Sequence, residues 1–266
     1  MSFREKYGPW AIISGASEGV GRELARKIAG EGVHCVLIAR RQGPLDVLAQ
    51  EIERDFGVEC LTASIDLSAP DAVEQIRATV GEREIGLYVS NAGGDPEGAK
   101  FLDAPLETWL GQVQRGISTV MGCCHHYGRE MRARGKGGLL LIGSGSCWGG
   151  SAFMAAYSGI KAFDLNFAES LWAELLPHNV DVLYMVLGTT DTPELRRLLA
   201  AKGLPLVSGL ADPADVAEVS LARLAQGPLY NWGLEDDATG HLPASAATRR
   251  ARVLAIGEAT KRIFGG

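Results

Sequence analysis

Short apolar runs alternate with longer amphipathic stretches along most of this chain. Six runs are apolar at nearly every position, as expected for buried β-strands, and they cover residues 10–14, 34–39, 60–65, 85–90, 138–143 and 180–186. Several are apolar on both faces, which is typical of parallel strands that are covered by helices above and below.

The stretches between these strands have helical periodicity and cover residues 20–32, 44–57, 70–81, 104–134 and 152–176. This alternation predicts an α/β fold, a doubly wound parallel β-sheet with helices on both faces.

Because the sequence has no internal repeat or linker, residues 1–266 are expected to form a single domain. Residues 188–211 include an apolar segment that fits either a lid over a cleft or an ordinary surface helix. A terminal helix is expected over residues 245–263.

Composition narrows the class of protein. Hydrophobic residues make up 46% and charged residues 22%, which is ordinary for a globular protein. The net charge of −6 and the lack of a phosphate-tracking basic stripe argue against nucleic-acid binding. No apolar stretch is long enough for a membrane span. The first residues are too polar for a secretory leader, so a cytoplasmic location is expected.

The sequence Cys123-Cys124-His125-His126 has the residue types of a metal site. Adjacent residues, however, point to different sides of a helix. Packing is therefore the preferred interpretation, and no metal is expected.

The stretch Ser14 to Gly21 fits two kinds of enzyme. Gly15 to Gly19 matches G-x-S-x-G, the turn that presents a hydrolase nucleophile, whereas Gly15, Gly19 and Gly21 match a dinucleotide-binding turn. Only 14 residues precede Gly15, too few for the oxyanion loop of a hydrolase, and no histidine has the context of a triad base. Strand, glycine turn and helix follow one another as the dinucleotide turn requires. Ser17 is therefore predicted to be part of a phosphate cradle.

A second motif lies far downstream. Tyr157 and Lys161 are four residues apart, on one face of a predicted helix, and Ser144 ends the fifth strand. With the glycine turn and Asn91-Ala92-Gly93, this set resembles the short-chain dehydrogenase/reductase family from Trp10 to about Pro213. The opening YGPWAIISGASEGVG also resembles family members that act on steroids and long acyl chains.

The resemblance implies an oxidoreductase that interconverts a secondary alcohol and a ketone. Tyr157 would be the proton donor to the ketone or the base toward the alcohol, and Lys161 would favour the phenolate and hold the nicotinamide ribose. Ser144 would hydrogen-bond the substrate oxygen, with Ser146 as a second hydroxyl nearby. A hydrophobic substrate is expected because Trp148, Phe153, Met154 and the 193–210 segment would line an apolar cleft, although such side chains are as often simple core. The predicted substrate residues are these three and Ser146.

Cofactor choice depends on the end of the second strand. Arg40 and Arg41 stand where an acidic residue would bind the ribose 2′-OH of NAD, and guanidinium groups suit a 2′-phosphate. NADP(H) is therefore predicted, although Glu18 occupies a position that is basic in many NADP-using relatives. The alternative interpretation of Arg40 and Arg41 is a solvated pair on the surface. By resemblance, the cofactor-binding residues are Gly15, Ser17, Glu18, Gly19, Val20, Gly21, Arg40, Arg41, Asp66, Leu67, Asn91, Ala92, Gly93, Tyr157, Lys161, Gly188, Thr190 and Thr192.

One position departs from the family pattern. Relatives usually have an asparagine in the long helix after the fourth strand, where it supports a water relay to the lysine; here the position is Gly116. Gln114, Ser118 or a water are the candidates to replace it. This departure leaves an NADP(H)-binding sensor with little turnover as the alternative function. A homodimer or homotetramer, formed through the helices at 104–134 and 152–176, is expected by resemblance.

Overall fold

The computed structural model describes residues 1–94, 98–233, 255, 258, 261 and 262. Its centre is a seven-stranded parallel sheet with the strand order β3-β2-β1-β4-β5-β6-β7. The strands are β1 (Trp10–Ser14), β2 (His34–Ala39), β3 (Cys60–Ser64), β4 (Ile85–Ser90), β5 (Gly137–Ile142), β6 (Val180–Val186) and β7 (Leu229–Asn231). The six predicted strands are confirmed to within one residue, and β7 was missed. The predicted helix at 245–263 lies largely outside the described residues.

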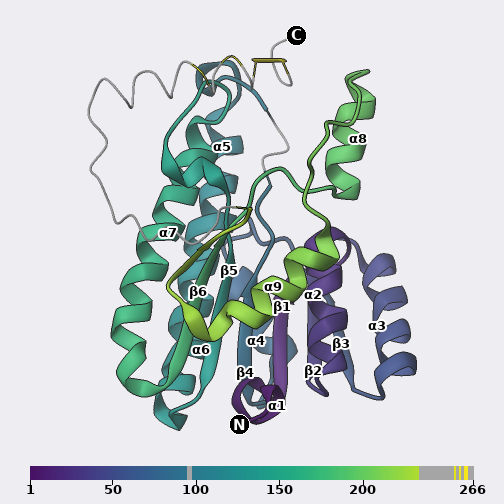
Figure 1. The fold of residues 1–266 in the computed structure, drawn as a ribbon, viewed down its shortest axis with the longest axis vertical. Helices are drawn as coiled ribbons and strands as arrows, with labels where there is room; N and C mark the ends of the chain where they lie inside the picture. The colour runs from purple at the N-terminus through teal and green to yellow at the C-terminus, as the bar shows by residue number, and fades with distance from the viewer. Residues whose placement is uncertain (95–97, 234–254, 256–257, 259–260, 263–266) are drawn as a thin grey trace.

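Helices cover both faces of the sheet (Figure 1). On one face lie α2 (Gly19–Gly30), α3 (Gln42–Phe56) and α9 (Pro213–Arg223). On the other lie α4 (Ala72–Val80), α6 (Thr119–Arg134) and α7 (Ala155–Leu175). The predicted doubly wound α/β fold is therefore confirmed. Short 3₁₀ turns occur at Phe101–Asp103, Gly145–Trp148, Leu176–His178 and Leu224–Gln226.

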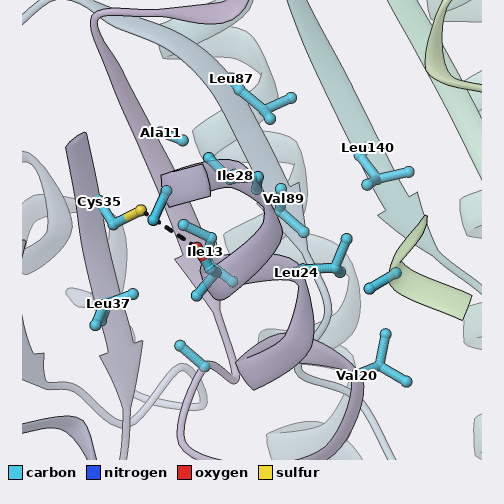
Figure 2. Packing of buried hydrophobic residues seen from close by; sticks show 14 of the residues in the cluster. Ala11, Ile13, Val20, Leu24, Ile28, Cys35, Leu37, Leu87, Val89 and Leu140 are labelled. Atoms are coloured by element: carbon cyan, nitrogen blue, oxygen red, sulfur yellow. Dashed lines mark hydrogen bonds between the residues drawn. The ribbon is translucent and has the colours of Figure 1, made fainter. Parts of the chain in front are cut away.

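The alternation of side chains along each strand divides the core into two halves. In β1, Ala11 and Ile13 face the α2 side, where they belong to one cluster with Leu24 and Ile28 (Figure 2). Ile12, between them, belongs to the cluster on the opposite face. Burying a side chain of this size contributes about 1.5–3 kcal/mol. The strands are therefore apolar at consecutive positions because each position has a helix above it.

The long helix predicted for 104–134 is interrupted. It consists of α5 (Leu106–Val113), a π-helical turn (Gln114–Ser118) and α6. Gly116, buried in this turn, packs against α7: a Cβ added there would lie 2.5 Å from Cγ2 of Ile160. A π-helical turn accommodates one extra residue within a continuous helix. The predicted helical segment is confirmed from Leu106 to Arg134, and the π-helical turn within it was not predicted because apolar periodicity does not reveal such a turn.

The carboxyl ends of the strands lie at the end of the molecule that is opposite α1 (Phe3–Tyr7), and α8 (Pro193–Ala201) stands there (Figure 1). The chain leaves β6, forms α8 and returns to α9. The two ends of this excursion are joined by an isolated parallel bridge between Thr190 and Ala211. The strand order reverses direction between β1 and β4, the place where doubly wound sheets bind ligands.

Candidate active site

A cleft of about 810 Å³ opens at the carboxyl ends of the strands, within the usual size range of ligand pockets. Eighteen of the predicted site residues line it, drawn from the turn after β1, the ends of β2 to β6, α7 and the start of α8. They are Gly15, Ser17, Glu18, Gly19, Val20, Arg40, Arg41, Asp66, Leu67, Asn91, Ala92, Gly93, Ser144, Tyr157, Lys161, Gly188, Thr190 and Thr192.

Gly21 is the predicted cofactor residue that does not line this cleft. It lies beneath the glycine turn, where an added Cβ would collide with the carbonyl oxygen of Gly15 and lie 2.5 Å from Nδ2 of Asn91. The Asn91 amide donates to the same carbonyl at 3.1 Å. Gly15 has a φ of 69°, a conformation that favours glycine. Gly21 therefore supports the turn from below rather than contacting a ligand.

The turn is tied to the end of β4 through Ser14. The hydroxyl of Ser14 donates to the carbonyl of Val89 at 3.2 Å and accepts from the backbone N–H of Asn91 at 3.0 Å. Ser14 is buried, so these bonds are shielded from competing water. Two predicted cofactor segments, the glycine turn and Asn91–Gly93, thereby share one rigid hydrogen-bonded frame.

Glu18 lies between two arginines at the mouth of the cleft. Its Oε2 accepts from Nη2 of Arg41 at 2.8 Å and from Nη1 of Arg197 at 3.1 Å. These guanidinium groups, Arg197 first, hold the pKa of the Glu18 carboxyl below its usual range. Arg40 and Arg41 are both exposed. The end of β2 thus presents positive charge, part of which is neutralised by Glu18.

Asp66 occupies the neighbouring wall. Its Oδ1 accepts from the hydroxyl of Ser68 at 2.7 Å and from the Ser68 backbone N–H at 3.0 Å. The Ser68 hydrogen bonds lower the pKa of the Asp66 carboxyl. An ionised Asp66 is therefore fixed in orientation at the edge of the cleft.

Ser144, Tyr157 and Lys161 line the other part of the same cleft. Ser144 precedes a 3₁₀ turn, and its Oγ accepts from the backbone N–H of Ser146 at 3.2 Å. Nζ of Lys161 lies 5.9 Å from the centre of the Tyr157 ring. It would lie 3.4 Å from a Cβ at Gly93, so the glycine gives the lysine room at the end of β4.

The Lys161 ammonium is buried and has two acceptors among the described residues. It donates to the carbonyl of Ile142 at 3.1 Å and to Oδ2 of Asp164 at 3.3 Å. Tyr184 of β6 donates its hydroxyl to the carbonyl of Lys161 at 3.0 Å. Burial raises the pKa of the Asp164 carboxyl, and the nearby Lys161 opposes part of that rise. Sequence reasoning did not identify Asp164, since it follows the Tyr-x-x-x-Lys motif at a position with no expected polar role.

The predicted substrate residues Ser146, Trp148, Phe153 and Met154 are not among the residues that line the cleft. They belong to the segment between Ser144 and α7, and Trp148 is exposed. The apolar lining comes instead partly from Leu187, Leu195 and Leu198. Sequence reasoning singled out the α8 segment as a whole, but no pattern distinguished its inward-facing side chains. It also missed the charged lining residues Arg115, Glu194 and Arg197.

A second cavity, of about 10 Å³, adjoins Tyr157 and Lys161. Gly116 and Gln112 contribute to its wall. Neither candidate for replacing the family asparagine reaches it: the Gln114 amide donates to the carbonyl of Ala69 at 3.4 Å, and Ser118 is exposed. Neither side chain is among the residues that line this cavity, and replacement of the asparagine by either one stays a prediction.

Ser144, Tyr157 and Lys161 thus lie in one cleft at the carboxyl end of a doubly wound sheet. No histidine lies among the described cleft-lining residues, so Ser17 has no triad base there. A family model described as short chain dehydrogenase matches residues 9–202. The chain belongs to the short-chain dehydrogenase family, and it is an oxidoreductase that acts on CH–OH groups.

The relatives found by sequence and structure agree with this assignment. A 7beta-hydroxysteroid dehydrogenase of Collinsella aerofaciens is 35% identical over 195 residues, 73% of this chain and 74% of that protein. One of Mediterraneibacter gnavus is 31% identical over 228 residues, 85% of this chain and 86% of that protein. A solved structure from a study of 7beta-hydroxysteroid dehydrogenase stereoselectivity superposes with a TM-score of 0.82 at 28% identity, over 100% of both chains.

Across the described residues, no group of histidine, cysteine or acidic side chains is arranged to hold a metal ion. In the same part of the chain, every helix is too short or too polar to cross a bilayer.

Proposed function

We propose that this protein is an NADP(H)-dependent oxidoreductase that interconverts a secondary alcohol and a ketone on a hydrophobic substrate. One observation carries the proposal: a single cleft is lined at one part by Arg40 and Arg41 and at another by Ser144, Tyr157 and Lys161. The cleft is large enough for a ligand that spans both. The 7beta-hydroxysteroid dehydrogenases among the relatives make hydroxysteroids the first substrates to test.

The residues present fit a phosphate-bearing dinucleotide. The helix α2 begins at Gly19 directly after the turn, and the first N–H groups of a helix have no partner within it, so they can bind a phosphate. Arg40 and Arg41 would hold a 2′-phosphate through charge-assisted bonds. Asp66 and Leu67 would border the adenine, and Gly188, Thr190 and Thr192 the carboxamide. When bound, the nicotinamide supplies the hydride.

The other steps belong to side chains of this chain. Tyr157 transfers its phenolic proton to the substrate oxygen during reduction and accepts it during oxidation. Ser144 donates a hydrogen bond to the same oxygen as negative charge develops on it. Lys161, one helical turn from Tyr157, has its Nζ 5.9 Å from the centre of the Tyr157 ring and would hold the nicotinamide ribose.

The apolar part of the substrate would lie against Leu187, Leu195 and Leu198. Leu195 and Leu198 are three residues apart in α8, on one face of that helix, and both line the cleft. Arg197 links the same helix to Glu18 of the glycine turn. We therefore propose that residues 188–211 act as a lid, with Ser146, Trp148, Phe153 and Met154 contacting substrate only once it is seated.

The alternative is a nucleotide sensor with little turnover, and the specific observation in its favour is Gly116 in place of a side chain near Lys161. Retention of Ser144, Tyr157 and Lys161 in one cleft weighs against it.

A homo-oligomer is also proposed, because the apolar side chains of Leu106, Leu110 and Met121 are exposed on α5 and α6. Light scattering on the purified protein tests this, and a monomeric mass would refute it.

The testing experiment is a fluorescence titration with NADPH and NADH. Wild type should bind NADPH much more tightly, and Arg40→Ala/Arg41→Ala should lose most of that preference. Arg54→Ala/Arg132→Ala, which removes two exposed arginines outside the cleft, is the charge-matched control. Turnover is then measured with NADPH and keto-steroids. Binding without turnover across the panel would favour the sensor; binding of neither nucleotide would overturn both proposals.

A further inference from the structure

Two arginines from distant parts of the chain meet at one carboxylate at the mouth of the cleft. Arg41 directly precedes α3, Arg197 belongs to α8, and Glu18 directly precedes α2. Nη2 of Arg41 and Nη1 of Arg197 donate to the same oxygen, Oε2 of Glu18, at 2.8 Å and 3.1 Å. Nη2 of Arg197 also donates to Oε1 of Glu18. All three side chains line the cleft, so two guanidinium groups converge there on one anionic group.

The beginning of α8 packs against the glycine turn, and this contact brings Arg197 within reach of Glu18. A Cβ added at Gly19, the first residue of α2, would lie 3.1 Å from Cγ2 of Thr192. The Thr192 hydroxyl caps α8 by accepting from the backbone N–H of Leu195 at 3.2 Å. Arg197 follows two residues later. The packing of α8 on the turn therefore keeps Arg197 on the Glu18 side of the cleft.

The ion pairs of Glu18 are weak and exchangeable. The side chains of Arg41 and Arg197 are 55% and 56% exposed, and that of Glu18 is 25% exposed. Water and salt screen such pairs, so they contribute little to stability. A phosphate monoester has three acceptor oxygens and a charge of about −1.5 to −2 at neutral pH, whereas a carboxylate has two oxygens and a single charge. A phosphate that enters beside Glu18 should therefore take over donors from both arginines.

The neighbouring arginine of α8 has a different environment. Nε and Nη2 of Arg196 donate to the two carboxylate oxygens of Asp191, each at 2.6 Å. Arg196 is as exposed as Arg197, but it is not among the described residues that line the cleft. The helix thus presents one guanidinium to the cleft and holds the next one outside it.

We infer that Arg197 is a specificity-determining residue of the cofactor site, which binds the 2′-phosphate of NADP(H) together with Arg41. This inference rests on the proposed function. NAD(H) has no phosphate at that position and leaves Arg197 on Glu18. The 2′-phosphate therefore ties α8 to the cofactor more firmly than the exposed ion pair ties it to the glycine turn. Leu195 and Leu198 of the same helix line the cleft, so the choice of cofactor is linked to the position of the proposed lid.

The test uses adenosine 2′,5′-bisphosphate and 5′-AMP, which differ by the 2′-phosphate and lack the nicotinamide. Arg197→Ala should weaken the binding of the bisphosphate and of NADPH by about tenfold, as expected for a charge-assisted contact, and that of 5′-AMP and NADH by less than about twofold. Arg197→Lys, which keeps the charge but not the fork of donors, should retain part of the affinity. Arg196→Ala removes the same charge from the same helix and is the matched control. It should change the affinity for NADPH by less than about twofold, since exposed charges outside the contact are screened.

A second background separates phosphate binding from neutralisation of Glu18. In Arg197→Ala the Glu18 carboxylate loses a partner and would repel a phosphate even if Arg197 had no contact with it. In Glu18→Gln this repulsion is absent, so adding Arg197→Ala there should still weaken bisphosphate binding by about tenfold. An effect of Arg197→Ala that disappears in the Glu18→Gln background would overturn the inference.

Hydrogen exchange over residues 193–201 measures how firmly α8 is held. At saturation the bisphosphate should slow exchange in wild-type α8 more than 5′-AMP does, and the difference should vanish in Arg197→Ala. Equal exchange with both nucleotides in wild type, or unchanged bisphosphate affinity in Arg197→Ala, would contradict the inference. A wild type that binds NADPH no more tightly than NADH would instead refute the proposed NADP(H) dependence, and the inference with it.

Discussion

Lys161 and Asp164 form a buried ion pair one turn apart on α7, with Nζ and Oδ2 at 3.3 Å and side chains 8% and 5% exposed. The lysine is the one assigned to the reaction, so this carboxylate stands directly behind it. Oδ1 of Asp164 is buried without a hydrogen-bond partner among the described residues. Burial outweighs the lysine in its effect on Asp164, since the pKa of the carboxyl is raised.

The raised pKa of the Asp164 carboxyl predicts how the stability of the folded protein depends on pH. An acid whose pKa is raised in the folded state binds protons more tightly there, so folding is favoured below the unfolded value of about 3.9 and loses that contribution as the pH rises through the folded value. The stability of wild type relative to Asp164→Asn should therefore fall from pH 4 toward neutrality. Urea unfolding midpoints of both proteins across this range measure it, and parallel curves would contradict the prediction.

Glu18 competes for the arginines that a 2′-phosphate would use. Glu18→Gln should free Arg41 and Arg197, and strengthen NADPH binding by on the order of 1 kcal/mol, about fivefold. NADH, which lacks that phosphate, should gain less. Titration with both nucleotides at two salt concentrations checks this, because the gain should shrink as salt screens the exposed charges. Equal gains for both nucleotides would mean that Glu18 acts on the whole cleft and not through Arg41.

Gly116 and Gly159 are both helical glycines, with different surroundings. Gly159→Ala in α7 meets no atom within 4 Å, so it should stabilise the protein by up to about 1 kcal/mol through helix propensity. Gly116→Ala meets Ile160 and should destabilise it by about 1–3 kcal/mol, as overpacking does. Thermal unfolding of both variants measures the difference. Adding Ile160→Ala should recover part of the loss at 116; if it recovers none, the clash is not its cause.

A substitution at Gly21 tests whether the conformation of the glycine turn after β1 is needed for nucleotide binding. Gly21→Ala forces a Cβ against the backbone carbonyl of Gly15, a contact that cannot be relieved by moving a flexible side chain. We expect NADPH binding weakened by at least about tenfold, with unfolding destabilised by about 1–3 kcal/mol. Gly43→Ala in α3, where nothing lies within 4 Å, is the control. Unchanged nucleotide affinity in Gly21→Ala would separate this glycine from the binding turn.

The strands and most of the cofactor cradle were predictable because local pattern determines them. A run such as residues 34–39 is apolar at consecutive positions only when both faces are covered, and the confirmed β2 is buried from Cys35 to Ala39. Tyr157 and Lys161 are four residues apart, so helix geometry alone places them on one face of α7, and both line the cleft. β7 escaped notice because three half-buried residues have no measurable period.

The neighbours of Lys161 were not predictable in the same way. Gly116 approaches Ile160 of α7 from the π-helical turn between α5 and α6, and Gln112 of α5 lines the cavity beside Lys161. The pairing of Arg197 with Glu18 joins residues 179 apart in sequence. Such relationships depend on tertiary packing, which a single sequence does not encode as a local pattern.

The isolated β-bridge between Thr190 and Ala211 joins the beginning and the end of the segment that contains α8. The backbone N–H of Asp191 donates to the carbonyl of Ala211 at 2.9 Å, and that of Ala211 to Thr189 at 3.1 Å. Lengthening a loop whose ends are already joined costs little, about 0.6 kcal/mol for each doubling. The segment between Thr190 and Ala211 can therefore be replaced by one of another length or sequence. Such a replacement would change which substrates bind and leave Ser144, Tyr157 and Lys161 in place.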